Sequence, residues 1–349
     1  EMRDSGVEQA FQPTIWPTMV EMGWTGILVP EQYGGSDLGY LTFGVVLEEM
    51  GKQLVASPLF ASALVGASAL LLGGNDAQKK KYLPAIVDGS EILTLAVDEG
   101  PRHAPARTAL AAKKTANGYS LSGPKTFVLE GMAATTFVVA ARTGGAAGET
   151  AGITLFLVPA KARGLSRRRL HTFDSRGYAN LEFANVEVGA DAVLGTVDAG
   201  FALLDGVLDR ARAGLGAEMI GTAAQAFDMT LSYLKTRVQF GKVIGSFQAL
   251  GHRAAMLFTS MELARSCAEG ALQAIDAKAD NAAELCSLSK SKVGDFLHEM
   301  SNQLIQIHGG IGMTDEFDAG LYLKRARALE ALYGNAAFHR DRYARLLGF

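Results

Sequence analysis

The chain has 349 residues, 48% of them hydrophobic and 20% charged, which is typical of a globular protein large enough for two or three domains. Its formal net charge of −3 gives no electrostatic reason to expect binding to nucleic acid. Cys267 and Cys286 form neither a disulfide framework nor a metal motif, and the six histidines are scattered, so we expect no metal site. No apolar run reaches membrane-spanning length, and the stretch EMRDSGVEQAF at the start lacks a signal-peptide pattern. We therefore expect a cytoplasmic protein that does not bind membranes.

Residues 1–92 are predicted to form an N-terminal helical domain. The apolar residues Trp16, Met19, Val20 and Trp24 recur at the spacing of one helical face. The stretch VPEQYGGSDLGY then marks a turn, because its Gly-Gly pair needs a flexible backbone, and a further helical run follows it.

The hydrophobic period changes at Ile92, where apolar residues begin to alternate. Several short strand-like runs follow, some separated by glycine-bearing gaps: Gly118–Ser122, Phe137–Ala141, Ile153–Val158, Asn180–Phe183 and Val186–Val188. Because no long helical run lies between them, this spacing predicts an antiparallel β-barrel or sandwich over residues 93–196.

The helical period returns at Gly200 and holds to the end of the chain. A stripe of small and apolar residues from Met256 to Cys267 is typical of tight antiparallel helix packing. We therefore predict a C-terminal four-helix bundle over residues 197–349, and an α+β fold with its domains in the order α, β, α.

One candidate site is the stretch YLKTRVQFGKVIGSFQ, from Tyr233 to Gln248. One helix is expected to end near Gly241, and a second is expected to run from Ala249 to Ala283. Arg237 at such a corner is suited to a phosphate, and Phe240 is suited to cover a flat ring. A corner of solvated charges is the alternative interpretation.

A second candidate site is the glycine cluster QIHGGIG, from Gln306 to Gly312. It follows a predicted helix and is compatible with an ordinary helix C-cap. It is also compatible with a bare backbone close to a ligand, to which the Gln306 amide would hydrogen-bond.

Taken together, YLKTRVQFGKVIGSFQALGH and QIHGGIGMTDEF resemble the acyl-CoA dehydrogenase family. GWTGILVPEQYGGSDLGYL, LTLAVDE and SGPKTFVL are similar to its other segments, so the resemblance covers nearly the whole chain. Members remove hydrogens from Cα and Cβ of an acyl-CoA thioester. A carboxylate takes the α-proton and FAD accepts the β-hydride, because an isolated side chain cannot accept a hydride.

The resemblance also implies a cofactor clamp that reaches the FAD diphosphate and adenosine of a neighbouring subunit. The residues at the matching positions are Arg237, Phe240, Gln248, Gln306, Gly309 and Gly310. Such a clamp implies a homo- or hetero-oligomer with a homologous dehydrogenase subunit. The family further implies an acyl-CoA substrate and an electron-transfer flavoprotein as electron acceptor.

The chain departs from the family where the reaction would occur. Tyr333 and Ala211 occupy the two positions at which members carry the glutamate base. Tyrosine has an ordinary pKa of about 10 and is a poor base at neutral pH. Near the flavin ring, Asp98 stands at the threonine of the family's turn, and Leu129 stands where a threonine usually donates a hydrogen bond.

Three hypotheses follow from these departures. The retained clamp and missing base resemble the small subunit of heteromeric acyl-CoA dehydrogenases, such as the pimeloyl-CoA and steroid side-chain types, in which a partner supplies the base. Alternatively, the chain is a self-sufficient homo-oligomeric dehydrogenase with a displaced base, either Glu330 or Glu218. The third hypothesis is a catalytically silent scaffold that binds CoA or a protein partner.

Overall fold

The computed structural model describes residue 7 and residues 9–349. The chain divides into two compact units. Unit 1 comprises the chain up to Gly39 together with Ala56–Ala211, and unit 2 comprises Tyr40–Val55 together with Arg212–Phe349. The predicted domain boundaries at residues 92 and 196 stay predictions.

Unit 1 begins with short helices. They are α1 (Ile15–Glu21), the 3-10 turns η1 (Trp24–Gly26) and η2 (Glu31–Tyr33), the buried π-helix η3 (Phe60–Gly66), α3 (Ala67–Gly73) and α4 (Asp76–Val87). Helix α4 starts at a capping box in which Asn75 Oδ1 accepts from the Gln78 backbone N–H and Gln78 Oε1 accepts from the Asn75 N–H. Gln78 also donates to the carbonyl oxygens of Asp191 and Val193, so the start of α4 is joined to the β-sheet.

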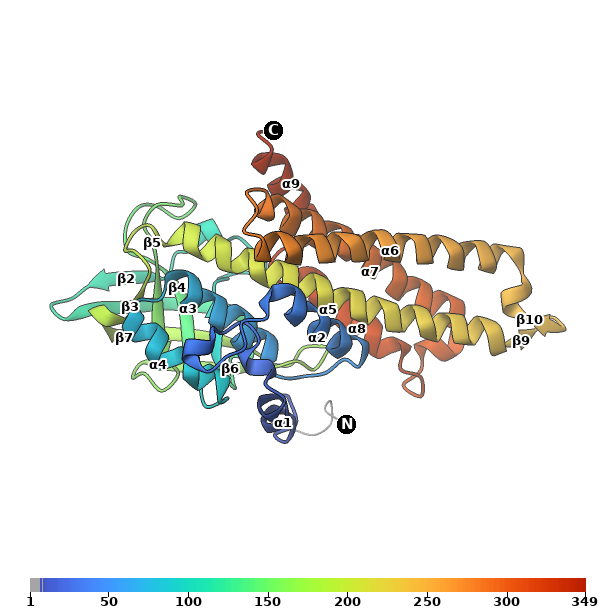
Figure 1. Ribbon diagram of the computed structural model, residues 1–349, viewed down its shortest axis with the longest axis horizontal. Helices are drawn as coiled ribbons and strands as arrows, with labels where there is room; N and C mark the ends of the chain where they lie inside the picture. The colour runs from blue at the N-terminus through green and yellow to red at the C-terminus, as the bar shows by residue number, and fades with distance from the viewer. Residues whose placement is uncertain (1–6, 8) are drawn as a thin grey trace. The chain divides into compact units, whose positions relative to one another are not determined.

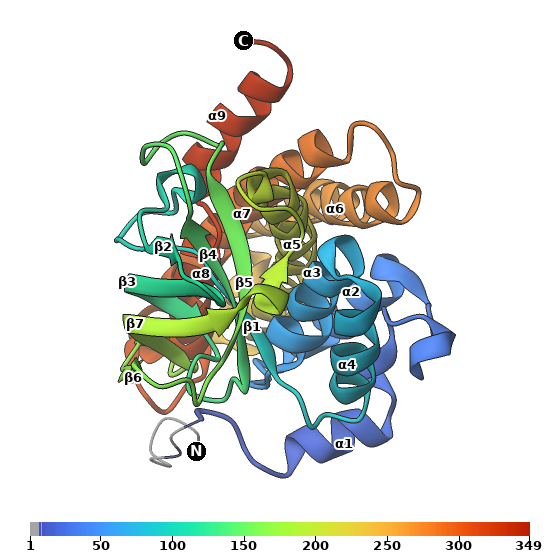
Figure 2. The same ribbon diagram turned by 90° about the vertical axis from the view of Figure 1, so that its left-hand side faces the viewer.

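The strands of unit 1 form one eight-stranded sheet, most of whose strands are labelled in Figure 2. They are β1 (Leu93–Ala96), β2 (Ala111–Lys114), β3 (Gly118–Leu129), β4 (Thr136–Arg142), β5 (Ile153–Pro159), β6 (Leu165–Leu170), β7 (Tyr178–Gly189) and β8 (Val193–Leu194), with the 3-10 turns η4 (Pro105–Arg107) and η5 (Ala190–Ala192) between them. The path is β6-β7-β3-β2-β4-β5-β8, with β1 beside β4. Most pairs are antiparallel, as expected, but β1 pairs with β4 in parallel because the β2–β3 hairpin lies between them in sequence.

Alternating residues of the sheet build its core. Phe137 and Val139 of β4 pack with Phe156 of β5 and Phe183 of β7 in one buried cluster. The intervening residues of β4 and β5 are buried as well, and the neighbouring strand β1 packs against η3. This accounts for the long apolar runs in these two strands.

Unit 2 is helical, and its long helices α5, α6 and α7 are visible in Figure 1. Its elements are α2 (Gly39–Lys52), α5 (Gly200–Thr236, which begins in unit 1), the strands β9 (Val238–Gln239) and β10 (Lys242–Val243), the turns η6 (Ile244–Ser246) and η7 (Gly309–Met313), α6 (Gln248–Asp276), α7 (Ala282–His308), α8 (Ala319–Ala331) and α9 (Ala336–Leu346). The acyl-CoA dehydrogenase-like α+β fold is confirmed. The helix predicted from Ala249 to Ala283 was too long, because the chain turns at Lys278, which has a positive φ of 51°.

Glycines allow α2 to approach α5 closely within unit 2. A Cβ on Gly51 of α2 would lie 2.2 Å from the Glu218 carbonyl oxygen of α5. A Cβ on Gly221 of α5 would lie 1.9 Å from the Glu48 carbonyl oxygen of α2. The two backbones therefore meet directly, and neither position accepts a side chain without separating the helices.

Candidate functional site

The predicted corner between α5 and α6 is confirmed, with a small hairpin inserted in it. Strands β9 and β10 are joined by a two-residue turn in which Phe240 has φ 54° and Gly241 has φ 77°. Two successive positive φ values define the turn that best matches hairpin twist. The turn leaves the Phe240 side chain 89% exposed.

The two glycine-bearing stretches lie side by side in unit 2. The ring of Tyr233, near the end of α5, stacks 4.3 Å from the ring of His308, at the end of α7. Leu234, Ile244 and Ile307 form a small buried cluster beside them. The structure therefore brings together the two segments that were singled out separately in the sequence.

The surface beside this contact is open and polar. The side chains of Arg237, Gln248 and Gln306 are exposed, and the Arg237 guanidinium has no hydrogen bond or ion pair with any described residue. Gly309 has φ 62° and ψ −135°, a conformation that only glycine adopts readily, and a Cβ on Gly310 would touch nothing. A guanidinium without a partner and a stretch of bare backbone each suit a phosphate-bearing ligand, and exposed Phe240 suits a flat ring.

His308 was not singled out in the sequence. Its ring is 3% exposed and lies between Tyr233 and Phe317, whose centroid is 4.6 Å away. Nδ1 donates to the Leu304 carbonyl oxygen over 2.7 Å, and burial lowers the pKa of the imidazole. A neutral ring thus connects the end of α7 to α5. In the sequence, its position inside the QIHGG stretch was the signal that could have identified it.

Neither of the two residues that the resemblance matches to the base positions is a carboxylate. Ala211 is fully buried in α5, and Tyr333 is 4% exposed with φ 53°, just after α8. The Tyr333 carbonyl oxygen accepts from His339 Nε2 over 3.0 Å. Burial, together with nearby Arg212, lowers the pKa of His339 to about 2, so this imidazole is neutral.

A buried amine holds the end of α8 beside Tyr333. Lys290 Nζ donates to the carbonyl oxygens of Leu329, Glu330 and Gly334 over 3.0 to 3.1 Å. Burial lowers the pKa of this amine to about 7. Two of these bonds satisfy carbonyls in the last turn of α8, and the third satisfies a carbonyl of the turn that follows it.

The two alternative bases are both engaged in ion pairs. Arg325 donates to Glu218 Oε1 from Nη2 over 2.7 Å and from Nε over 3.1 Å, with both side chains buried. Glu330 accepts from Arg327 Nη1 over 2.6 Å and lies 3.0 Å from His298 Nδ1. The side chain of Glu330 is 19% exposed, so it is the more accessible carboxylate of the two.

A buried lysine holds the turn that is expected beside the flavin ring. Glu99 accepts from the fully buried Lys125 Nζ over 2.7 Å, and Lys125 also donates to the Val97 carbonyl oxygen. Burial lowers the pKa of Lys125, while the Glu99 carboxylate opposes that shift. Leu129 is buried and Asp98 lies at the turn, so neither of these residues replaces the hydrogen-bond donor that the family uses.

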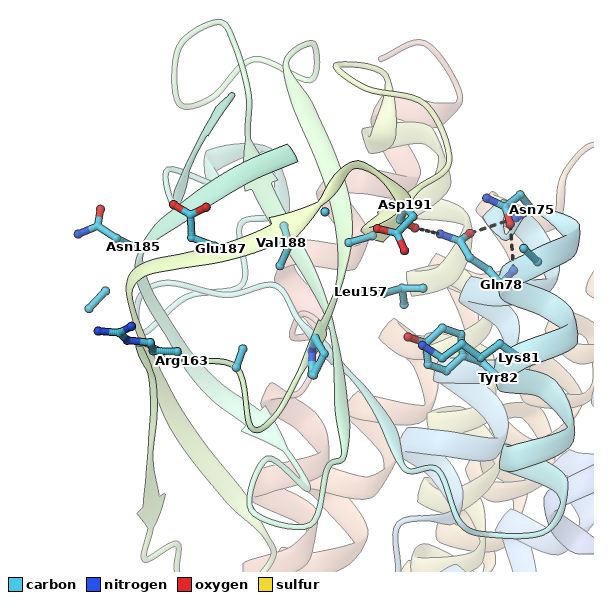
Figure 3. A pocket seen from close by; sticks show the side chains of 17 residues that line it. Asn75, Gln78, Lys81, Tyr82, Leu157, Arg163, Asn185, Glu187, Val188 and Asp191 are labelled. Atoms are coloured by element: carbon cyan, nitrogen blue, oxygen red, sulfur yellow. Dashed lines mark hydrogen bonds between the residues drawn. The ribbon is translucent and has the colours of Figure 1, made fainter. Parts of the chain in front are cut away.

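A further cavity of about 870 Å³ lies between α4 and the sheet in unit 1 (Figure 3). Lys81 and Tyr82 line it from α4, and Arg163 and Glu187 line it from the sheet side. No residue predicted from the sequence lies there. Within residues 7 and 9–349, no cluster of side chains suits a metal ion. In the same part of the chain, no helix is long and apolar enough to cross a membrane.

Comparison with known proteins identifies the family. Family models of the acyl-CoA dehydrogenase N-terminal, middle and C-terminal domains match residues 2–90, 99–187 and 198–348. Mitochondrial isovaleryl-CoA dehydrogenase of Solanum tuberosum is 31% identical over 333 residues, which cover 93% of this chain and 80% of that protein. The caffeyl-CoA reductase-Etf complex subunit CarC of Acetobacterium woodii is 30% identical over 323 residues, which cover 91% of this chain and 84% of that protein.

A solved structure agrees over the full length. The ChsE4-ChsE5 complex from Mycobacterium tuberculosis has a chain that matches with a TM-score of 0.88 and 27% identity, covering 99% of this chain and 90% of that one. Three successive domain models, relatives of 30% and 31% identity and a matching α, β, α element order all agree. The chain therefore belongs to the acyl-CoA dehydrogenase family.

Proposed function

We propose that this chain is one subunit of a heteromeric acyl-CoA dehydrogenase, and that a homologous partner carries the catalytic glutamate. Its membership of the family makes it an oxidoreductase acting on acyl-CoA, with FAD as cofactor. The observation that carries the proposal is that Tyr333 and Ala211 occupy both usual base positions and are buried. A tyrosine held there does not accept a proton from carbon at neutral pH without a large fall in its pKa.

The residues of unit 2 fit one end of FAD. Arg237 offers an unpaired guanidinium to the diphosphate, and the bare backbone at Gly309 and Gly310 admits close contact. Phe240, Gln248 and Gln306 are exposed as well. Bound FAD supplies a hydride acceptor, which no side chain provides. The role of the chain's own residues is to hold and orient the cofactor.

The exposure of this clamp supports a second subunit. The clamp residues are exposed on the surface of this chain. They would form a closed cofactor site if a second subunit held the remaining part of FAD against them. The related ChsE4-ChsE5 structure is a complex of two named chains, and CarC belongs to a complex with Etf. We therefore propose a homologous subunit as structural partner and an electron-transfer flavoprotein as electron acceptor. We also propose that the complex works in the direction of acyl-CoA oxidation.

The test compares the chain alone with the chain co-expressed with its homologous partner. We expect acyl-CoA oxidation by a dye acceptor only in the co-expressed complex, with FAD present in that complex. The matched variant is Tyr333→Glu, which should raise the activity of the chain alone if the lost base is the limiting defect. Full turnover by the unmodified chain purified without a partner would refute the proposal.

One observation favours a self-sufficient enzyme as a second candidate. Lys290 Nζ bonds both the Glu330 and the Gly334 carbonyl oxygens, so Glu330 lies beside the turn that carries Tyr333. Its carboxylate is partly exposed. If Glu330 is a displaced base, Glu330→Gln should abolish turnover by the chain alone while its FAD content stays unchanged.

A further inference from the structure

We propose that the cavity between α4 and the sheet of unit 1 binds a small zwitterion, a molecule that carries one carboxylate and one ammonium group. The cavity has a volume of about 870 Å³. Pockets that hold small molecules measure about 300–1,000 Å³. None of the clamp residues of unit 2 lines this cavity, and neither Ala211 nor Tyr333 does. Its residues are therefore different from those expected to hold FAD or to stand at the base positions.

Charged side chains of both signs line the cavity without pairing with each other. Lys81 of α4 and Arg163 of the loop before β6 carry positive charge, whereas Glu187 of β7 and Asp191 of η5 carry negative charge. All four side chains are exposed, and none of them has a hydrogen bond or ion pair with any described residue. Groups of both signs are thus available to a ligand, the cations as donors and the carboxylates as acceptors.

A buried phenol at the wall of the cavity also lacks a partner. Tyr82 is only 8% exposed, and its side chain extends from α4 towards the sheet beside Lys81 (Figure 3). Its hydroxyl group has no hydrogen bond with any described residue, although a tyrosine whose ring is buried usually has one. The hydroxyl can donate to a ligand carboxylate that Lys81 also holds.

Hydrogen bonds hold the walls of the cavity in place before a ligand arrives. Gln78 Nε2 of α4 donates to the carbonyl oxygens of Asp191 and Val193 over 2.9 and 2.8 Å, which joins the helix to the sheet beside the cavity. On the sheet side, the Ala184 backbone N–H donates to the Gly164 carbonyl oxygen over 2.9 Å. Walls that are already joined lower the entropy lost on binding.

The lining favours a zwitterion over a simple anion or cation. Two cationic and two anionic side chains leave the cavity without net charge, so it attracts neither sign by itself. A molecule with one group of each sign can pair with both kinds of side chain. Leu157 of β5 and Val188 of β7 add apolar surface to the lining. A free amino acid with an apolar side chain combines these three features.

The experiment measures binding of L-methionine to the full-length chain by ligand-observed NMR at low salt. Methionine is the probe because its flexible thioether chain adapts to an apolar wall. Two analogues each lack one charge: 4-(methylthio)butanoate lacks the ammonium group, and 3-(methylthio)propylamine lacks the carboxylate. Loss of one exposed ion pair should weaken binding by about fivefold, so both analogues should bind less tightly than L-methionine.

Three variants test the lining residues. Lys81→Gln and Asp191→Asn each remove one charge and should weaken L-methionine binding by about fivefold. Tyr82→Phe keeps the buried ring but removes the hydroxyl donor, and it should weaken binding by about threefold. The matched control is Lys80→Gln, because Lys80 is the next exposed lysine of α4, has no partner among the described residues and does not line the cavity. Thermal melting checks that all variants fold.

Weaker binding by both analogues and by the three lining variants, with unchanged binding by Lys80→Gln, supports the site. The proposal is overturned if the wild-type chain does not bind L-methionine, or if either analogue binds as tightly as L-methionine does. It is also overturned if Lys80→Gln weakens binding as much as Lys81→Gln does. The FAD content of the co-expressed complex tests the proposed function separately, because none of these variants changes a clamp residue.

Discussion

One substitution in the hairpin turn between β9 and β10 is expected to change the stability of the chain and its proposed FAD affinity in opposite directions. Phe240 occupies a left-handed conformation with φ 54°, and Gly241 follows it. Asn-Gly is the sequence most favoured at such a turn, whereas a bulky residue is strained there. We therefore predict that Phe240→Asn stabilises the chain and weakens FAD binding.

The size of the effect follows from the local contacts. A left-handed conformation costs an ordinary residue about 1–2 kcal/mol, and asparagine relieves much of this strain. The variant loses the edge-to-face contact with Phe247, whose ring lies 6.1 Å away at 83° and which contributes about 0.5 kcal/mol. Phe240 is 89% exposed, so little buried area is lost. The net gain in the free energy of unfolding should be about 0.5–1 kcal/mol.

Urea unfolding of the FAD-free chain measures the stability, and flavin fluorescence measures FAD affinity. Loss of ring stacking should weaken FAD binding by about 1 kcal/mol, or roughly fivefold. Phe240→Leu is the matched control, because it keeps an apolar side chain and the strained backbone but lacks the flat ring. It should weaken FAD binding without raising stability. If Phe240→Asn binds FAD as tightly as the wild type does, Phe240 does not contact the cofactor.

Three further substitutions test buried groups of unit 2. Lys290→Met should lower the free energy of unfolding by about 3 kcal/mol, because three carbonyl oxygens lose their donor. Burial lowers the Lys290 pKa from 10.5 to about 7. The unfolded chain therefore binds more protons between these values, and wild-type stability should rise with pH across that window. Urea unfolding of Lys290→Met at several pH values should lack this rise. If the stability of the variant still rises with pH as in the wild type, Lys290 is not the cause of the rise. Glu218→Gln should cost about 3 kcal/mol, because it removes the buried carboxylate that pairs with Arg325, and thermal melting should show the loss even in FAD-free protein. An Arg325 contact important only for catalysis would leave the melting temperature unchanged. Burial also lowers the pKa of His308 below its ordinary 6.5, so stability should fall as the pH drops below that value. His308→Phe keeps the aromatic stack and should flatten this acid limb in thermal melts, whereas an identical limb would exclude His308 as its cause.

The order of domains and the existence of the two glycine-bearing stretches were predictable because each depends on local signals. Helical and strand periods alternate clearly along the chain, and the corner at Gly241 and the cluster at Gly309 both carry glycines that punctuate helices. The family resemblance then joined the two stretches, and the stacking of Tyr233 on His308 confirms that they meet. The roles of Arg237, Phe240, Gln248, Gln306, Gly309 and Gly310 in binding FAD stay predictions.

Long-range pairings were not predictable, because no local signal encodes them. The parallel register of β1 on β4 depends on a crossover through the β2–β3 hairpin. The partner of Glu218 lies far along the chain at Arg325, so the sequence alone did not distinguish a buried ion pair from a free base.

The glycine contact between α2 and α5 has a consequence for how the chain acquires its structure. Gly51 must meet the Glu218 backbone, yet more than 150 residues separate them in sequence. During synthesis α2 therefore emerges long before its partner, and its apolar residues Phe43 and Leu47, fully buried in the final structure, stay uncovered meanwhile. Unit 2 cannot be completed until late in translation. A fragment that starts at residue 197 would lack α2 altogether and leave the facing surface of α5 exposed to aggregation.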